Sequence, residues 1–149
     1  MGASEKKILL VEDNPDDVEL TLEALRSNHV QNEVVHAWNG VEALDYLFGT
    51  GTYDGRDTSD QPVLVLLDLN LPKVGGIEVL RRMRGDPRTR MLPVVVLTSS
   101  KEDVDVRRAY ALGANTYLAK PVALDGLIEM VRTLGLYWFL TAQRPVIAG

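Results

Sequence analysis

The sequence contains no cysteine. A disulfide framework, a thiolate metal site and a cysteine nucleophile are therefore excluded. Histidine is scarce as well, with 2 residues, and His36 has no second histidine at metal-ligand spacing. We interpret His36 as a half-buried strand residue and not as a ligand.

Basic residues are fewer than acidic residues. The chain has 16 Lys and Arg and 21 Asp and Glu, which gives a net charge of −5. Nucleic acids are bound through clustered Lys and Arg, so this balance argues against nucleic acid as the main partner. No segment has the roughly 18 consecutive apolar residues of a membrane helix, and Met1–Lys7 lacks the apolar core of a signal peptide. We therefore expect no membrane partner and a cytoplasmic location, with which the lack of cysteine agrees.

The chain is long enough for one domain. Its 149 residues, 46% of them hydrophobic and 25% charged, suit a single soluble globular domain with a real core. We predict one domain over residues 1–149, which leaves no residues for a DNA-binding or enzymatic output domain.

The stretch Val63–Pro72 organises the prediction. Five consecutive apolar residues, Val63–Leu67, end at the carboxylate of Asp68. The run is too short for a core helix and rich in β-forming residues, so it predicts a strand covered on both faces. A single Asp after a strand is commonly a turn or cap residue, so a functional role depends on what else arrives at that edge of the sheet.

Strand and helix patterns alternate five times along the chain. The predicted strands are Ile8–Val11, Glu33–Ala37, Val63–Leu67, Val94–Leu97 and Thr116–Ala119. The predicted helices run from Pro15 to Ser27 or Asn28, and over Val41–Phe48, Gly76–Arg84, Glu102–Leu112 and Ala123–Leu134. This alternation predicts an α/β fold with a parallel sheet, because right-handed crossovers place helices on both of its faces.

Local signals mark several boundaries. Asn14 suits a helix N-cap, and Asp16 and Asp17 suit the positive end of the helix dipole that follows. Asn39-Gly40 predicts a turn, and Gly75-Gly76 predicts a tight turn into a helix.

For two segments the sequence leaves two interpretations of their role open. Gly49–Gln61 is a long polar insertion, for which an interaction surface and disorder without function are equally open. Near the C-terminus, Tyr137, Trp138, Phe139 and Leu140 would form an exposed apolar patch, which monomers rarely tolerate. We predict that this patch packs in a homodimer interface; the alternative is that it folds back on its own domain.

Polar groups arrive at one rim of the predicted sheet from four strands. Glu12 and Asp13 follow the first strand, and Asp68, Thr98 and Lys120 follow the third, fourth and fifth. Each has an ordinary structural explanation alone, but ligands bind at this edge of a parallel sheet. Clustered carboxylates repel one another and need a cation, and oxygen ligands without His or Cys favour Mg²⁺. An Asp beside Mg²⁺ can attack a phosphoryl group and form an acyl phosphate, while Lys120 and Thr98 bind phosphoryl oxygens.

In this order the rim residues resemble the receiver domain of two-component response regulators, over about residues 5–134, which leaves 135–149 as a C-terminal extension. The resemblance implies a doubly wound, flavodoxin-like (βα)5 sandwich whose strands follow the order 2-1-3-4-5. It implies that Asp68 accepts a phosphoryl group from a sensor histidine kinase. Asp13 and Asp68, with the backbone carbonyl of Asn70, would hold Mg²⁺, and Glu12 would reach the ion directly or through water.

The same resemblance assigns roles beyond the acidic residues. Thr98 would follow the phosphoryl group and Tyr117 would occupy the aromatic switch position, so that phosphorylation drives a two-state change. Lys120-Pro121 would be a cis peptide bond.

A narrower resemblance points to the single-domain response regulators of bacterial phytochromes. It is carried by the Gly49–Gln61 loop, the Pro87–Pro93 segment and the aromatic tail. In that group the C-terminal segment is associated with dimers, which agrees with a homodimer through the C-terminal helix and tail.

We expect a signalling protein and not an enzyme, and the sequence lacks a feature that each of two rival functions needs. A Mg²⁺-dependent phosphatase with an Asp nucleophile needs an acid/base carboxylate two residues after it, where this chain has Asn70. A flavodoxin-like electron carrier needs a hydroxyl-rich phosphate loop after the first strand, where Glu12 and Asp13 would repel the phosphate of FMN.

Overall fold

The computed structural model describes residues 7–27, 30–98, 103–120, 125–126 and 129. Its strands form one parallel sheet in the order β2-β1-β3-β4-β5. The strands are β1 (Ile8–Val11), β2 (Val34–Ala37), β3 (Leu64–Asp68), β4 (Val94–Thr98) and β5 (Thr116–Ala119). The sheet and its order confirm the predicted flavodoxin-like α/β fold.

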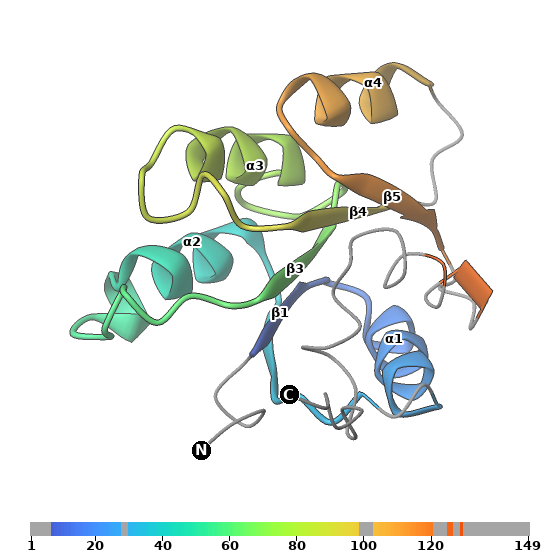
Figure 1. The fold of residues 1–149 in the computed structure, drawn as a ribbon, viewed down its shortest axis with the longest axis horizontal. Coiled ribbons are helices and arrows are strands. Elements are labelled where there is room, and N and C mark those ends of the chain that lie inside the picture. The colour runs from blue at the N-terminus through green and yellow to red at the C-terminus, as the bar shows by residue number, and fades with distance from the viewer. Residues whose placement is uncertain (1–6, 28–29, 99–102, 121–124, 127–128, 130–149) are drawn as a thin grey trace, which may run out of the picture.

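Helices cover both faces of this sheet. They are α1 (Pro15–Ser27), α2 (Gly40–Phe48), α3 (Gly76–Arg84) and α4 (Asp103–Ala111), with a 3₁₀ turn, η2 (Gly51–Tyr53), after α2. In Figure 1, α1 lies on one side of the sheet, while α2 and α3 lie on the other. None of the helices described here is long and apolar enough to cross a membrane.

The core is built around the central strand β3, whose residues are all buried. Val65 and Leu67 belong to the cluster that includes α2 and α3, whereas Leu64 and Leu66 belong to the cluster that includes α1. Successive side chains of a strand point to opposite faces, and each fully buried leucine contributes about 1.5–3 kcal/mol. The apolar run is therefore a strand covered on both faces, as its pattern predicts.

Two strands run one residue further than the sequence indicates. Asp68 and Thr98 are the last residues of β3 and β4, not the first residues after them. Asp68 pairs with Leu97 and Thr98 pairs with Ala119, because the ladder uses backbone groups whatever the polarity of the side chain. Both polar side chains are thereby held on rigid strand ends.

The turn predicted at Asn39-Gly40 is wrong. Asn39 is the N-cap of α2, where its side-chain oxygen accepts a hydrogen bond from the Glu42 N–H at 2.9 Å, and Gly40 is the first helical residue. A Cβ at Gly40 would lie 1.9 Å from the Val74 carbonyl oxygen. Glycine is needed here for close packing of backbones and not for a turn conformation.

Several predicted features fall outside the described residues. They are the Lys120-Pro121 peptide bond, most of the helix Ala123–Leu134 and the aromatic segment Tyr137–Leu140. Of that helix the structure describes Asp125, Gly126 and Glu129, and all three are helical. The homodimer stays a prediction.

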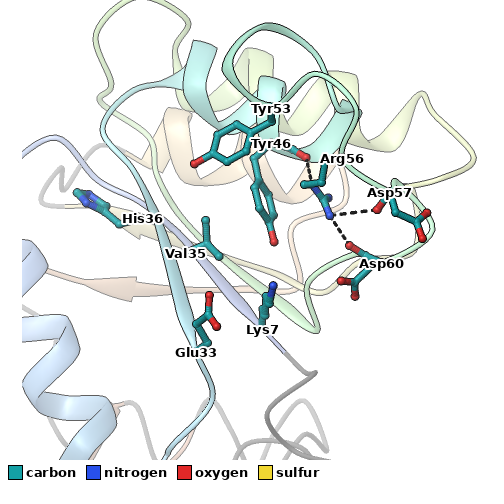
Figure 2. Close-up of a pocket in the computed structure, with 9 residues that line it drawn as sticks. All are labelled: Lys7, Glu33, Val35, His36, Tyr46, Tyr53, Arg56, Asp57 and Asp60. Carbon is teal, nitrogen blue, oxygen red and sulfur yellow. Dashed lines mark hydrogen bonds between the residues drawn. The ribbon is translucent and has the colours of Figure 1, made fainter. Parts of the chain in front are cut away.

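The Gly49–Gln61 segment is a structured loop that Arg56 holds together, so the interpretation as disorder is wrong (Figure 2). The guanidinium donates to the carbonyl oxygens of Tyr46 and Asp60, both at 2.6 Å, and of Asp57 at 3.2 Å. It also lies over the Tyr46 ring, 3.9 Å from its centroid. With β2, the loop borders a hollow of about 470 Å³, and its role as an interaction surface stays a prediction.

Replacing Arg56 by Lys is expected to lower the free energy of unfolding by about 2 kcal/mol. A lysine ammonium keeps one carbonyl contact but loses the planar fork that makes several at once, and it loses the stacking on Tyr46. Urea denaturation measures the difference. The control is Arg26→Lys, because Arg26 forms an exposed pair with Glu23 at 3.0 Å and should change stability by less than about 0.5 kcal/mol. Equal losses in the two variants would contradict the role of Arg56.

Candidate functional site

The predicted strand-end residues meet at the carboxyl edge of the sheet. Backbone hydrogen bonds continue the ladder past the strands: the Glu12 N–H donates to the Ala37 carbonyl and the Lys120 N–H to the Thr98 carbonyl, both at 3.0 Å. Residues that follow β1 and β5 are thereby fixed beside the ends of the neighbouring strands. This edge holds acidic, hydroxyl and ammonium side chains that are far apart in the sequence.

Three carboxylates gather at this edge. Glu12, Asp13 and Asp68 each place an oxygen within 4.8 Å of the other two. Glu12 and Asp68 are buried, with 0% and 1% of the residue exposed, whereas Asp13 is exposed and opens the cluster to solvent. Asp13 and Asp68 are thus close enough to share one cation.

Lys120 places its ammonium among these acids. Its Nζ lies 3.0 Å from Asp68 Oδ2, 3.2 Å from Glu12 Oε1 and 3.2 Å from Asp17 Oδ2. The Lys120 side chain is 10% exposed, so it is stabilised by these partners and not by water, unlike most lysines. Its charge is aimed at the oxygen of Asp68.

Burial and repulsion control the ionisation of this cluster. Burial raises the pKa of Glu12 to about 7, and the hydrogen bond and charge of Asp68 act in the same direction. The Asn14 N–H and the Lys120 charge lower the same pKa, but by less. Burial alone would lower the pKa of Lys120, yet the hydrogen bond and charge of Asp68, followed by Glu12 and Asp17, raise it above its ordinary value. Lys120 is therefore charged, and one ammonium does not balance the acids around it.

Backbone N–H groups orient the two buried carboxylates. The Asn70 N–H donates to Asp68 Oδ1 at 3.0 Å, and the Asn14 N–H donates to Glu12 Oε2 at 3.2 Å. Asp68 is thus held by Asn70 on one oxygen and by Lys120 on the other. The carboxylate has a fixed direction, which suits an attacking group.

Two contacts of this site are not apparent in the sequence. His36 is half-buried, as predicted, and its Nε2 donates to the Glu12 carbonyl oxygen at 2.8 Å. Asp17, which the sequence explains as a partner of the helix dipole, also contacts Lys120. Both contacts depend on the packing of β2 and α1 beside β1, which no local pattern encodes.

The predicted switch residues lie on neighbouring strands. Thr98 is buried, with 2% of the residue exposed, at the end of β4. Tyr117 lies on β5 with 46% exposed, and its ring packs edge-on against Tyr110 at 6.4 Å between centroids. One residue is therefore close to the site and the other is on the surface.

The side chains present fit a magnesium ion. The donors that the cluster offers are carboxylate oxygens, which Mg²⁺ prefers. Burial is the main cause of the raised pKa of Glu12, and the hydrogen bond and negative charge of Asp68 add to it, so a divalent cation at this cluster would offset negative charge that is poorly solvated. Mg²⁺ is therefore the cofactor consistent with this site.

Magnesium is expected to raise the midpoint of thermal unfolding by about 3–6 °C at a concentration ten times its dissociation constant. Binding to the folded state alone stabilises it by about 1.4 kcal/mol under these conditions. A differential scanning calorimeter measures the shift, with NaCl of equal ionic strength as the control for screening. The shift should shrink in Asp13→Asn, which keeps the fold but removes one exposed carboxylate. An equal shift in NaCl, or an undiminished one in that variant, would contradict a metal site here.

Comparisons with known proteins agree with the geometry. Residues 8–132 match the family model described as the response regulator receiver domain. Response regulator Rcp1 of Synechocystis sp. is 39% identical over 140 residues, which cover 94% of this chain and 93% of that protein. The family resemblance found in the sequence is thereby confirmed.

Solved structures give the same result. The bacteriophytochrome response regulator AtBRR is 49% identical with a TM-score of 0.78, over 93% of this chain and 98% of that chain. The phosphorylated cyanobacterial phytochrome response regulator RcpA is 42% identical with a TM-score of 0.75, over 94% of this chain and 98% of that chain. The Mn²⁺-bound form of Rcp1 is 38% identical with a TM-score of 0.74, over 95% of this chain and 99% of that chain.

Proposed function

Because this chain belongs to the response regulator receiver domain family, we propose that Asp68 is the residue that takes the phosphoryl group. The chain is a receiver, a phosphoacceptor of two-component phosphorelays. The observation that carries the choice of Asp68 is its position 3.0 Å from the Lys120 ammonium, on the central strand and beside Glu12 and Asp13. The test is the increase in intact mass on incubation with acetyl phosphate and Mg²⁺, which should be absent in Asp68→Asn.

In the proposed step an oxygen of Asp68 attacks the phosphorus of a phosphohistidine on the kinase. The new O–P bond forms as the P–N bond breaks, and the electron pair leaves with the ring nitrogen, which then takes a proton from solvent. Lys120 neutralises charge on the transferred group, and Thr98 donates its hydroxyl hydrogen to a phosphoryl oxygen. The Asn70 N–H holds the second oxygen of Asp68 and keeps the first one directed at phosphorus.

The residues that would hold Mg²⁺ are Asp13, Asp68 and the Asn70 carbonyl, with Glu12 reaching it directly or through water. When bound, the ion neutralises phosphoryl charge and so lowers the barrier to transfer.

The structural change caused by phosphorylation is proposed to pass from Thr98 to Tyr117. Thr98 pairs with Ala119 across β4 and β5, two residues from Tyr117. A Thr98 drawn toward the phosphoryl group would bias the exposed face where Tyr117 packs on Tyr110. Tyrosine ring NMR signals recorded before and after phosphorylation test this, and unchanged Tyr117 and Tyr110 signals would contradict it.

A sensor histidine kinase is the donor that this family implies, and we propose that it is a phytochrome. The support is the likeness to the bacteriophytochrome response regulator AtBRR and the cyanobacterial phytochrome response regulator RcpA. Phosphotransfer from a panel of labelled kinases, phytochromes included, should be fastest from a phytochrome. Equal or faster transfer from unrelated kinases would contradict the proposal.

The homodimer through the C-terminal helix and Tyr137–Leu140 is supported by the apolar pattern of that segment. Light scattering that finds monomers at high micromolar concentration, with or without phosphorylation, would contradict it.

A further inference from the structure

We propose that Asp17 is a positioning residue for phosphoryl transfer, acting through Lys120. The inference deepens the proposed function and rests on it. Asp17 lies in the first turn of α1, and its Oδ2 is 3.2 Å from Lys120 Nζ. The Asp17 side chain is 21% exposed and that of Lys120 is 10% exposed, so water screens this pair far less than a surface pair.

The Lys120 ammonium donates hydrogen bonds to both carboxylate oxygens of Glu12 and to Asp68 Oδ2, and it forms an ion pair with Asp17 Oδ2. Lys120 has three N–H bonds to donate, and Glu12, Asp17 and Asp68 lie 3.0–3.2 Å from its nitrogen on different elements of the fold. A four-carbon side chain that is fixed by contacts with Glu12 after β1, Asp17 in α1 and Asp68 in β3 has little freedom to move. Because Lys120 must meet the phosphoryl group in one place, this restraint is part of its chemistry.

Asp17 differs from Glu12 and Asp68 in that it is not part of the proposed metal site or the proposed acceptor. Glu12 and Asp68 belong to the carboxylate cluster that fits a cation, and Asp68 is also the proposed acceptor. Their oxygens are drawn to the metal or the phosphoryl group during the reaction. Asp17 is outside that cluster, so its contact with Lys120 is the one that can persist throughout.

The backbone of Asp17 is held in place at the start of α1. Asn14 caps the helix, and its side-chain oxygen accepts hydrogen bonds from the Asp16 N–H at 2.8 Å and the Asp17 N–H at 3.2 Å. The helix dipole alone would favour an acid at either position. Asp16 is exposed, whereas Asp17 is turned toward Lys120, so Asp16 is the natural control.

The test is the rate of phosphorylation by acetyl phosphate, followed by mass spectrometry over a range of Mg²⁺ concentrations. Asp17→Asn should lower the maximal rate about tenfold, the loss expected when one charge-assisted contact is weakened. The Mg²⁺ concentration at half-maximal rate should stay within about twofold of wild type. Asp16→Asn, with the same change of charge, should stay within about twofold in both quantities.

A double-mutant cycle identifies Lys120 as the intermediary. In a Lys120→Met background, Asp17→Asn should cause no further loss. Asp17→Glu, which keeps the charge and can still reach the ammonium, should recover most of the rate. Thermal melts in Mg²⁺ establish whether each variant is folded. If Lys120→Met is unfolded, the recovery of the rate by Asp17→Glu is the test of the role of Asp17.

Three results would overturn the inference while leaving the proposed function intact. They are an unchanged or faster rate in Asp17→Asn, an equal further loss without Lys120, and a shifted Mg²⁺ dependence, which would make Asp17 a metal ligand. A faster rate would mean that Asp17 acts by repelling the anionic donor. A wild-type protein that takes up no phosphoryl group, or an Asp68→Asn variant that still does, would defeat the proposed function and this inference with it.

Discussion

Asp68→Asn is expected to take up no phosphoryl group from acetyl phosphate and Mg²⁺, with a rate at least about 1,000-fold below that of wild type. An amide oxygen is a poor nucleophile and does not form the acyl phosphate. An Asn oxygen can still accept the Asn70 N–H that holds Asp68 Oδ1 at 3.0 Å, whereas the amide NH₂ takes the place of Oδ2 and cannot accept from Lys120. Intact-mass spectrometry measures the addition of one phosphoryl group.

Loss of labelling in this variant should not come from unfolding. Asp68 is one of the groups that raise the pKa of Glu12, so its neutralisation relieves repulsion between buried acids. The Lys120 ammonium keeps Glu12 and Asp17 as partners. We therefore expect the midpoint of thermal unfolding of Asp68→Asn to equal or exceed that of wild type without Mg²⁺.

The control for the chemistry is Asp13→Asn. It removes a carboxylate from the same cluster but leaves the nucleophile, so labelling should return as Mg²⁺ is raised. Labelling that persists in Asp68→Asn, or that is lost irrecoverably in both variants, would show that the acceptor is misassigned.

The positions of Asp68 and Thr98 could be predicted because each of them ends an apolar run. Val63–Leu67 and Val94–Leu97 are continuous apolar runs, which predict strands buried on both faces. In a parallel sheet the residues after such strands must share one edge, so Asp68 and Thr98 could be placed together without coordinates. Lys120 follows β5, whose residues are half-buried or exposed, so its place at this edge was indicated by the alternation of strands and helices and not by a buried apolar run.

Contacts between helices, loops and the site could not be predicted in this way. Asp17 reaches Lys120 only because α1 packs against the sheet with a particular rotation about its axis, and composition and periodicity do not define that rotation. Arg56 holds the loop after α2 through backbone carbonyls, which every residue possesses, so no partner stands out in the sequence. The sequence pattern at Asn39 predicts a turn where the structure has an N-cap, because turns and N-caps favour the same side chain.

The glycine pair at the start of α3 is another case in which the sequence pattern does not reveal a contact. Gly75 and Gly76 are equivalent in a sequence pattern, but a Cβ at Gly76 would lie 2.3 Å from the Asp68 carbonyl oxygen and 2.8 Å from the Leu69 Cα. At Gly75, the added carbon would meet no described atom within 4 Å, and the backbone there, with φ of −71°, suits alanine. The first residue of α3 therefore packs directly on the backbone of the proposed phosphoacceptor.

Gly76→Ala is accordingly expected to lower the free energy of unfolding by about 3 kcal/mol and to slow phosphorylation. The clash is with backbone atoms, which cannot turn aside as a flexible side chain does, so either α3 or the end of β3 must move. Gly75→Ala should change stability by less than about 0.5 kcal/mol, because the poorer N-cap is offset by a less flexible unfolded chain. Urea denaturation and acetyl phosphate labelling of both variants measure the two effects. Equal stability of the two variants would mean that α3 moves away from Asp68 at little cost, and a normal labelling rate in Gly76→Ala would mean that its close packing does not position the acceptor.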